Sequence, residues 1–137
     1  MDAFGVFRVS ASALEAQRQR MNVISSNMAN VQSTRSEEGG PYKKKEVLFS
    51  SVQLEGGSAD LSGVRVTDVI PSEDPTKMIF DPTHPDSNSE GYVEMPNVTV
   101  IEEMVNMMMA FRAYEASVAT FNMSKAMYMK ALELGRP

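Results

Sequence analysis

His84 is the only histidine in this chain of 137 residues, and it stands in a proline-rich stretch with Asp81 and Asp86 nearby. Imidazole and carboxylate groups so close together are potential metal ligands. A closed zinc site needs three or four ligands, however, and no further residue is spaced to complete the set. Calcium is disfavoured even if Glu90 is included, because the stretch lacks the alternating ligands and closing glutamate of a calcium loop. We therefore expect an exposed loop histidine and no metal.

Other catalytic patterns are missing from the sequence. No serine lies in a Gly-x-Ser-x-Gly elbow, and no glycine-rich loop followed by Lys-Ser or Lys-Thr could hold a phosphate. Glu102 and Glu103 are adjacent, so on a helix they point in different directions and cannot act together as an acid–base pair on one substrate. We therefore expect neither enzyme activity nor a cofactor.

The composition excludes further kinds of site and partner. The chain has no cysteine, which excludes disulfides and thiolate metal sites. The net charge is −5, and the acidity is concentrated in residues 36–97, which hold twelve acidic and five basic side chains. Only Lys43–Lys45 forms a basic cluster, so we expect no nucleic-acid partner. No apolar run approaches the length of a direct membrane span, and no cleavable secretory signal is visible.

The residues that could carry function are instead apolar and regularly spaced near the C-terminus. Between Val100 and Leu132 they recur at alternating intervals of four and three residues, a heptad pattern that is broken only at Lys125. No proline or glycine interrupts the segment, so one long helix over 100–132 is predicted. The apolar heptad positions are Val100, Met104, Met107, Phe111, Tyr114, Val118, Phe121, Tyr128 and Leu132.

The length of this helix is itself informative. At about 1.5 Å per residue it would be about 50 Å long, whereas a compact domain of this size should be about 35 to 40 Å across. Asn97 or Thr99 is expected to cap its start. The apolar stripe must contact another helix, in the same chain or in a neighbouring one, because it would otherwise remain exposed. A long core helix in an all-helical monomer is the alternative.

A second helix is predicted over residues 1 to about 31. One row of apolar side chains repeats every seven residues, at Phe7, Leu14, Met21 and Met28. A second row is apolar only at Ile24 and Val31, because its earlier positions are polar. A helix with so few apolar side chains is weak alone and needs a partner stripe. We therefore expect the two ends of the chain to lie together.

The middle of the chain changes from helical to strand periodicity. Apolar and polar residues alternate over 45–51 and 63–70, and further short strands are predicted at 77–80 and 92–95. Gly56-Gly57-Ser58 is expected to connect the first two strands. These segments indicate a small β unit between the two helices.

The predicted fold class is mainly α with a small β unit, in which long N- and C-terminal helices pack as a coiled-coil-like stem. Three domains are expected. Residues 1–35 form an N-terminal helix with a sequence motif, residues 36–97 a small β and loop domain with short strands, and residues 98–137 the long C-terminal helix.

Residues 12–30 have the sequence Ser-Ala-Leu-Glu-Ala-Gln-Arg-Gln-Arg-Met-Asn-Val-Ile-Ser-Ser-Asn-Met-Ala-Asn. This segment resembles the N-terminal signature of the bacterial flagellar axial proteins, the group of rod, hook and hook–filament junction proteins. The Ser-x-Asn-x-Ala-Asn core of that signature falls on Ser25, Asn27, Ala29 and Asn30. Most members continue with Thr-Pro-Gly-Tyr, whereas residues 34–42 of this chain resemble the proximal-rod proteins of the group.

Further stretches support the narrower resemblance to proximal-rod proteins, and together they cover nearly the whole chain. They are residues 63–66, 81–86, 91–93, 95–98, 102–107 and 112–116. One departure is Thr99-Val100-Ile101, where a proline commonly precedes the helix. That difference affects only the position at which the helix begins.

The resemblance implies a structural subunit of the flagellar basal-body rod, which self-assembles through its terminal helices and transmits torque. Such subunits are exported unfolded by the flagellar type III export apparatus, without a cleaved signal peptide, and assemble in the periplasm. The implied partners are other proximal-rod proteins, the rod base protein, the distal rod and the export apparatus. Like and unlike subunits would form a helical tube, with the terminal helices in its inner wall and the middle domain facing outward.

We therefore expect an assembly interface built from both terminal helices. In the N-terminal helix it comprises Leu14, Met21, Ile24, Asn27, Met28 and Asn30, and in the C-terminal helix the apolar heptad positions given above. A cytoplasmic helical adaptor that binds one partner through the C-terminal helix is the alternative. The adaptor would make a single contact, whereas rod subunits make contacts that propagate helically.

Overall fold

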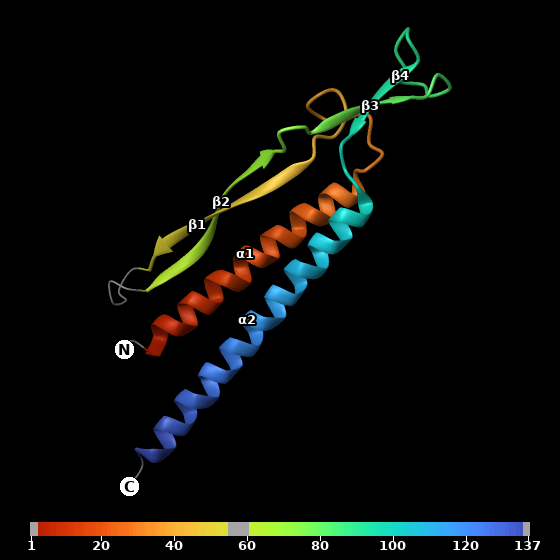
Figure 1. Cartoon of the computed structure of the whole chain (residues 1–137). Helices are drawn as coiled ribbons and strands as arrows, with labels where there is room; N and C mark the ends of the chain where they lie inside the picture. Colours follow the sequence, from red (N-terminus) through yellow and green to blue (C-terminus); the bar gives the residue numbers. More distant parts are fainter. Residues whose placement is uncertain (1–2, 55–60, 136–137) are drawn as a thin grey trace.

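The structure is a computed structural model, and it describes residues 3–54 and 61–135 of the chain. Within these residues a long helix stands at each end, and short strands lie between the helices (Figure 1). The predicted long terminal helices and short-stranded middle are thereby confirmed. The elements are α1 (Ala3–Ala29), β1 (Lys45–Gln53), β2 (Ser62–Pro71), β3 (Thr76–Phe80), β4 (Tyr92–Pro96) and α2 (Val100–Leu134).

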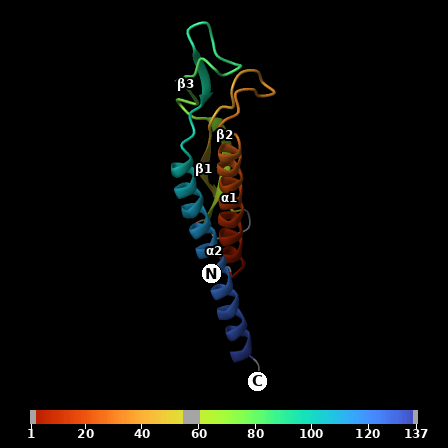
Figure 2. The same ribbon diagram turned by 90° about the vertical axis from the view of Figure 1, so that its right-hand side faces the viewer.

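Helices α1 and α2 lie side by side and run in opposite directions, as two perpendicular views show (Figures 1 and 2). Phe7 packs edge-on against Phe121, with ring centroids 5.0 Å apart. Near the other end of the pair, the Asn27 side chain donates a hydrogen bond to Glu103. The prediction that the two ends of the chain lie together is confirmed by these contacts.

Helix α2 is longer than α1, with 35 residues against 27, which corresponds to about 52 Å against about 40 Å. The rings of Phe4 and Tyr128 meet near the start of α1, and α2 continues beyond them to Leu134. The C-terminal end of α2 therefore projects past α1 (Figure 1). Despite this length, no helix in the described part of the chain is apolar enough to cross a membrane.

The start of α2 lies at Val100, where the heptad pattern predicts it. Thr99 occupies the N-cap position, as predicted, but its side chain makes no capping hydrogen bond. Asn97, the other candidate, donates its side-chain amide to the Asp74 carbonyl oxygen instead. The backbone alone closes the first turn, because the Glu103 N–H donates to the Thr99 carbonyl oxygen.

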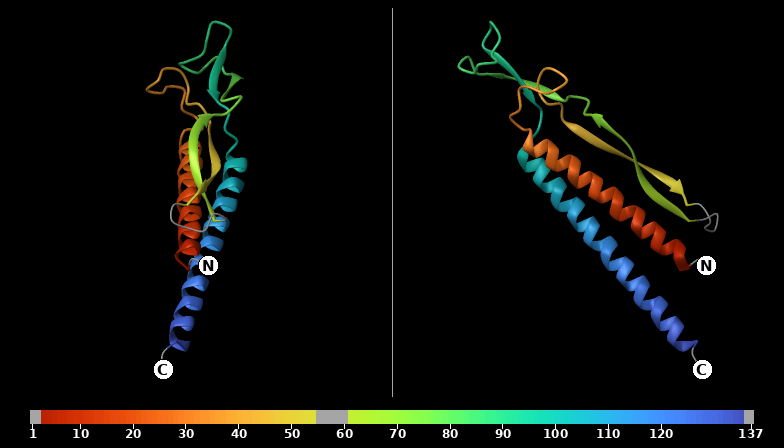
Figure 3. Two further views of the ribbon diagram at one scale, coloured as in Figure 1. Left: turned by 90° about the vertical axis from the view of Figure 1, so that its left-hand side faces the viewer. Right: turned by 180° about the vertical axis from the view of Figure 1, so that it is seen from behind.

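Strands β1 and β2 form an antiparallel hairpin that packs along α1 on the side away from α2 (Figure 3). Lys45 pairs with Pro71 at one end of the hairpin, and Gln53 pairs with Ser62 at the other. The predicted connection Gly56-Gly57-Ser58 lies outside the described residues. The molecule is therefore layered as hairpin, α1 and α2, with α1 in the middle.

The hairpin approaches α1 most closely at Gly63, which is buried against Ser12. A Cβ atom at Gly63 would lie 2.7 Å from Ser12 Oγ, closer than real Cβ contacts allow. The Ser12 hydroxyl donates to the Val9 carbonyl oxygen and accepts from the Val64 N–H, so it links α1 to β2. The missing side chain at Gly63 is what lets the strand lie this close to the helix.

Strands β3 and β4 form a second antiparallel hairpin, which lies beyond the end of the helix pair (Figure 1). The Phe80 and Tyr92 rings pack edge to face, with centroids 5.2 Å apart. Gly91 has a φ of +84°, a conformation that favours glycine, and a Cβ atom there would lie 2.9 Å from the Phe80 ring. The two hairpins confirm the four predicted strand segments.

Few apolar side chains are fully covered within the described part of the chain. The buried ones are Ala16, Ile24, Val93, Val98 and Ala110. Exposed apolar side chains are larger, and many of them belong to α2. Large exposed apolar surfaces commonly mark interaction sites. The surface of this chain therefore indicates that it associates with other chains.

Candidate assembly interface

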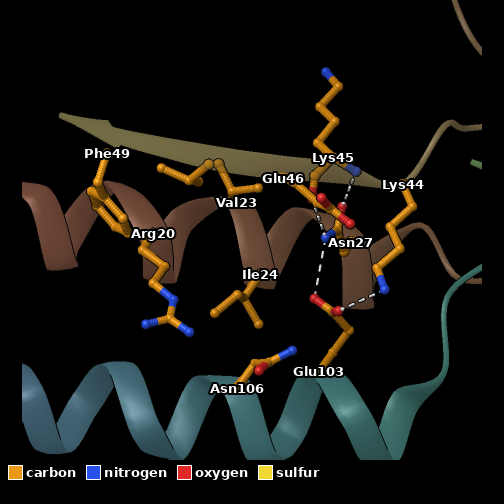
Figure 4. A pocket seen from close by; sticks show the side chains of 11 residues that line it. Arg20, Val23, Ile24, Asn27, Lys44, Lys45, Glu46, Phe49, Glu103 and Asn106 are labelled. Carbon is orange, nitrogen blue, oxygen red and sulfur yellow. Dashed lines mark hydrogen bonds and ion pairs between the residues drawn. The ribbon is translucent and has the colours of Figure 1, made fainter. Parts of the chain in front are cut away.

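Two polar side chains are deeply buried where α1, β1 and α2 meet (Figure 4). Asn27 and Glu103 are each 2% exposed. Asn27 Nδ2 donates to the Lys45 carbonyl oxygen at 2.9 Å and to Glu103 Oε2 at 3.1 Å. Asn27 Oδ1 accepts from the Lys45 N–H at 3.0 Å and from the Tyr42 hydroxyl at 2.9 Å. The amide group thus uses both of its donor hydrogens and both of its acceptor positions inside the subunit.

The Glu103 carboxylate completes this cluster. Its Oε1 lies 3.6 Å from Lys44 Nζ, while its Oε2 accepts from Asn27. Removing a carboxylate from water is costly, and only well-placed partners offset that cost. A shift of α2 along α1 would separate Glu103 from both partners. The cluster therefore favours one register of α2 against α1 and β1.

A trough of about 450 Å³ opens beside the cluster, between α1, β1 and α2. The Arg20 and Asn106 side chains extend into it from the two helices (Figure 4). Val23 and Phe49 contribute apolar walls.

The face of α2 that meets α1 is made of small and polar side chains as well as aromatic ones. Ala110 is completely buried, and Phe121 packs on Phe7. Ser117 and Ser124 follow Ala110 at intervals of seven residues and are half-buried. Each serine hydroxyl donates to the backbone carbonyl four residues earlier, so it needs no partner on α1. Small side chains at these positions allow the two helices to approach closely.

An apolar side of the helix pair remains open. One groove of about 470 Å³ is lined by Ser25, Met28, Met104, Met107 and Met108. A second groove of about 440 Å³ is lined by Phe111, Tyr114, Glu115, Val118, Ala119 and Asn122. Their linings are dominated by methionine and aromatic side chains, which suits the packing of another helix.

The loop that contains His84 is tied to the segment after α1. Arg35 and Thr34 hydrogen-bond the Asp86 carboxylate, with Arg35 the stronger cause, and together they hold the pKa of that carboxyl below its ordinary value. The expectation of an exposed loop histidine is wrong, because His84 is half-buried and its Nδ1 accepts from the Asp86 N–H. Within residues 3–54 and 61–135, no three His, Asp or Glu side chains gather into a possible metal site.

Two sequence profiles match the chain, one near each end. The profile described as "Flagella basal body rod protein" matches residues 7–35, and the profile described as "Flagellar basal body rod FlgEFG protein C-terminal" matches residues 89–134. The first match covers most of α1 and the segment after it, and the second covers β4 and α2. The matched segments are therefore the ones that form the helix pair.

Three relatives that match along almost their full length share one name. The flagellar basal-body rod protein FlgC of Escherichia coli O6:H1 is 45% identical over 136 residues, which cover 99% of this chain and 100% of the relative. FlgC of Bacillus subtilis is 43% identical over 150 residues, which cover 99% of this chain and 100% of the relative. FlgC of Borreliella burgdorferi is 40% identical over 151 residues, which cover 98% of each chain.

The chain belongs to the FlgC family of flagellar basal-body rod proteins. The predicted resemblance to proximal-rod proteins is thereby confirmed, and the chain is a structural rod subunit. The alternative of a cytoplasmic adaptor finds no support among the FlgC relatives.

The expected interface residues of this FlgC-family chain divide into two groups in the single subunit. Those exposed at the surface are Val100, Met104, Phe111 and Leu132. Those half-buried or buried are Leu14, Met21, Ile24, Asn27, Met28, Asn30, Met107, Tyr114, Val118, Phe121 and Tyr128. The two asparagines of the signature form different hydrogen bonds. Asn27 donates to Lys45 of β1 and to Glu103 of α2, whereas Asn30 donates to the Ser26 carbonyl oxygen, four residues earlier.

Sequence reasoning missed exposed apolar side chains that lie off the heptad rows. They are Val105, Met109, Met123, Met127 and Leu134, whereas the exposed Ile101, Met108 and Met129 were expected to widen the heptad stripe. The sequence signal for these exposed side chains was the run of three methionines, Met107–Met109. Successive residues of a helix point in different directions, so such a run places apolar side chains on more than one side of it. It also missed Glu103 and Ala110, which face α1 but are too polar or too small to stand out in an apolar pattern.

Proposed function

We propose that this chain is a subunit of the proximal rod and that it joins neighbouring subunits through α1 and α2. The main support is that α2 has exposed apolar side chains along its whole length, from Val100, which is 41% exposed, to Leu134, which is 88% exposed. Among the described helices and strands, α2 packs along α1 alone, and the Lys44 side chain adds an ion pair with Glu103 near the start of α2. A helix with exposed apolar side chains along its whole length belongs in a buried environment, which a neighbouring subunit can supply.

The free energy available from this surface is large enough for assembly. Complete burial of one large apolar side chain is worth about 1.5 to 3 kcal/mol, so a side chain that is already half covered contributes about half of that. Association costs about 4 to 15 kcal/mol in lost freedom of movement. Several half-exposed methionine, valine and phenylalanine side chains along α2 together offset this cost.

In the assembled rod, α1 and α2 form a coiled-coil-like stem in the inner wall of a helical tube, and the small β domain faces outward. The proposed domains are residues 1–35, 36–97 and 98–137. Family profiles that match near the two ends support the role of the terminal segments in the shared architecture. The middle domain, residues 36–97, then provides the outer surface of the rod.

The partners and location that we propose follow the axial-protein resemblance. The subunit contacts further copies, other proximal-rod proteins, the rod base protein and the distal rod. It is exported by the type III apparatus without a cleaved signal peptide, and it assembles in the periplasm, where the rod transmits torque. Membership of the FlgC family supports this placement.

The test is complementation in a flagellated strain from which the cognate rod subunit has been deleted. An epitope-tagged chain should restore swimming, and electron microscopy of isolated basal bodies should place the tag on the proximal rod. His84→Ala is the matched control, because His84 lies in a loop that is remote from α2, and it should restore swimming equally. Recovery of the chain in the cytoplasm as a complex with one partner would instead favour an adaptor.

A further inference from the structure

The exposed surface of α2 carries two separate apolar rows. Row A consists of Met104, Phe111 and Val118, and row B consists of Met109, Ala116 and Met123. Each row repeats every seven residues. Val105 and Met127 extend row B by one helical turn at each end.

The two rows lie on different sides of the helix. Successive residues are about 100° apart around an α-helix, which places the rows about 140° from each other. The side of α2 that contacts α1, at Ala110 and Phe121, lies in the wider of the two arcs that separate the rows. An α2 helix packed on α1 therefore presents one apolar row to each side of the subunit.

The rows also differ in shape. The residues of row A line the two open grooves, in which Met28 and Tyr114 contribute further apolar surface. Row B stands out from the helix, with Met123 at 66% and Met127 at 68% exposed. A groove on one side and a ridge on the other are complementary, as in the packing of ridges into grooves between helices.

Opposite charges accompany the two rows. Glu115 lines a groove beside row A, four residues after Phe111. Arg112 lies beside row B, three residues after Met109. Both side chains are exposed, and neither forms a salt bridge with a residue in the described part of the chain. Arg112 of one copy and Glu115 of another are therefore available to pair across a contact between the two rows.

We propose that row B of one copy packs into the row A groove of the next copy, with Arg112 facing the neighbour's Glu115. This inference rests on the proposed rod function. It gives the contact a polarity, which means that the two copies meet through different surfaces. Because the two surfaces differ, the contact is heterologous, and each copy keeps one free row A or row B for a further copy. Equal seven-residue repeats allow the rows to interdigitate along their length.

The size of the contact indicates when it forms. The rows span residues 104–127, or about 36 Å of helix with a width of about 10 Å, so one contact buries roughly 700 Å² in total. That is less than the roughly 1,000 Å² expected of a stable specific interface. A single contact therefore does not hold a dilute pair together, and the subunits associate where several contacts form at once, on a growing rod.

Cysteine cross-linking tests the polarity, because the chain has no cysteine of its own. Val118→Cys marks row A and Ala116→Cys marks row B, and the two variants carry different tags. Both are expressed separately and together in the deletion strain, and intact basal bodies are oxidised. Ser51→Cys on the exposed side of β1, paired with Ala116→Cys, is the control for random cross-linking.

Cross-linked dimers are expected only when the row A and row B variants are present together. Self-cross-linking of either variant alone would show a two-fold contact and overturn the polarity, while leaving the rod function intact. Absence of every cross-link in motile cells would show that other proteins cover the rows, and it would also overturn the inference.

Charge reversal gives an independent test that does not depend on cysteine geometry. Arg112→Glu or Glu115→Arg alone places like charges together and should lower the number of assembled basal bodies by about tenfold or more. The double variant restores the opposite pairing and should recover most of the loss. Arg65→Glu on the exposed side of β2 is the matched control and should have no such effect.

The results for these variants distinguish an error in the Arg112–Glu115 pairing from an error in the proposed rod function. If both single reversals assemble normally while Phe111→Asp still abolishes the rod, the Arg112–Glu115 pairing is wrong and α2 remains an assembly helix. If the double variant is as defective as the single ones, the two side chains do not face each other across this contact. Normal rods from all of these variants and from Phe111→Asp would contradict the proposed function itself.

Discussion

Helices α1 and α2 are packed against each other, yet the subunit covers them very differently. Helix α1 has α2 on one side and the β1–β2 hairpin on the other, whereas α2 packs along α1 alone among the described elements and adds the Glu103–Lys44 ion pair near its start (Figure 3). The outer surface of α1 carries charged side chains such as Glu15 and Arg18, which pair with each other. The outer surface of α2 carries Met109 and Phe111.

This difference indicates a division of roles. Apolar side chains of α1 are largely used to hold the subunit together, and those of α2 remain available to neighbours. A substitution on α1 should therefore lower the stability of the monomer, while a substitution on the outer face of α2 should block assembly without unfolding the monomer. The following variants test this contrast.

The largest effect is expected from Phe111→Asp. The side chain is 52% exposed in the monomer, so about half of its apolar contact is at stake and the free energy of unfolding should fall by only about 1 kcal/mol. In an assembled rod the new carboxylate would be buried without a partner, which is costly. Swimming and rod assembly should be lost at a normal level of exported protein. Phe111→Leu, which stays apolar, should assemble, and a motile Phe111→Asp strain would contradict the role of α2.

Ile24→Ala should show the opposite behaviour. Ile24 is 6% exposed between α1 and its neighbours, so truncation leaves a cavity and should lower the free energy of unfolding by about 2 to 4 kcal/mol. Chemical denaturation of the purified subunit measures this change. Val100→Ala, at an exposed position of α2, is the matched truncation and should change the stability little. If both variants lowered the free energy of unfolding equally, the proposed difference in role between α1 and α2 would be wrong.

Glu103→Ala tests the buried cluster that joins α2 to α1 and β1. The substitution leaves Asn27 Nδ2 without one acceptor and Lys44 without its carboxylate, which should cost about 1 to 3 kcal/mol of unfolding free energy. Glu102→Ala, an exposed neighbour on the same helix, is the control. If the two variants were equally stable, the cluster would not be important for the register of α2.

Gly63→Ala tests the contact between the hairpin and α1. The added Cβ would lie 2.7 Å from Ser12 Oγ, so the strand must move away and the unfolding free energy should fall by about 1 kcal/mol or more. Ser12→Gly removes the clashing hydroxyl but also its bond to the Val64 N–H, so the effect of Gly63→Ala is compared within the Ser12→Gly background, where it should be smaller than in the parent. An equal loss in both backgrounds would show that the clash is not the cause.

The smallest effect is expected from Asp86→Asn, and it should depend on pH. Hydrogen bonds from Arg35 and Thr34 lower the pKa of the Asp86 carboxyl in the folded subunit. The carboxylate therefore stabilises the fold above its unfolded pKa of about 3.9, and this contribution is lost as the pH falls through the lower folded pKa. The stability difference between parent and variant should shrink in acid. Asp68→Asn, at an exposed position of β2, is the control for the loss of one carboxylate.

The sequence by itself determined the elements and their order. Periodicity is a local property, so the alternation over 45–51 and 63–70 predicted β1 and β2, and the heptad pattern after Val100 predicted α2 almost to the residue. The missing proline and glycine in that segment made its length predictable as well. The axial-protein signature around Asn27 identified the family for the same reason, because it is a contiguous pattern.

The tertiary structure decided which side of each helix is covered. Heptad spacing placed Phe111 and Phe121 in one stripe, but α2 turns so that Phe121 faces α1 and Phe111 faces solvent. That rotation is set by the small side chain of Ala110 and by the bond between Glu103 and Asn27, two residues that are 76 positions apart in the chain. Such a contact depends on how the whole fold brings distant segments together, and no local pattern of apolar residues contains that information.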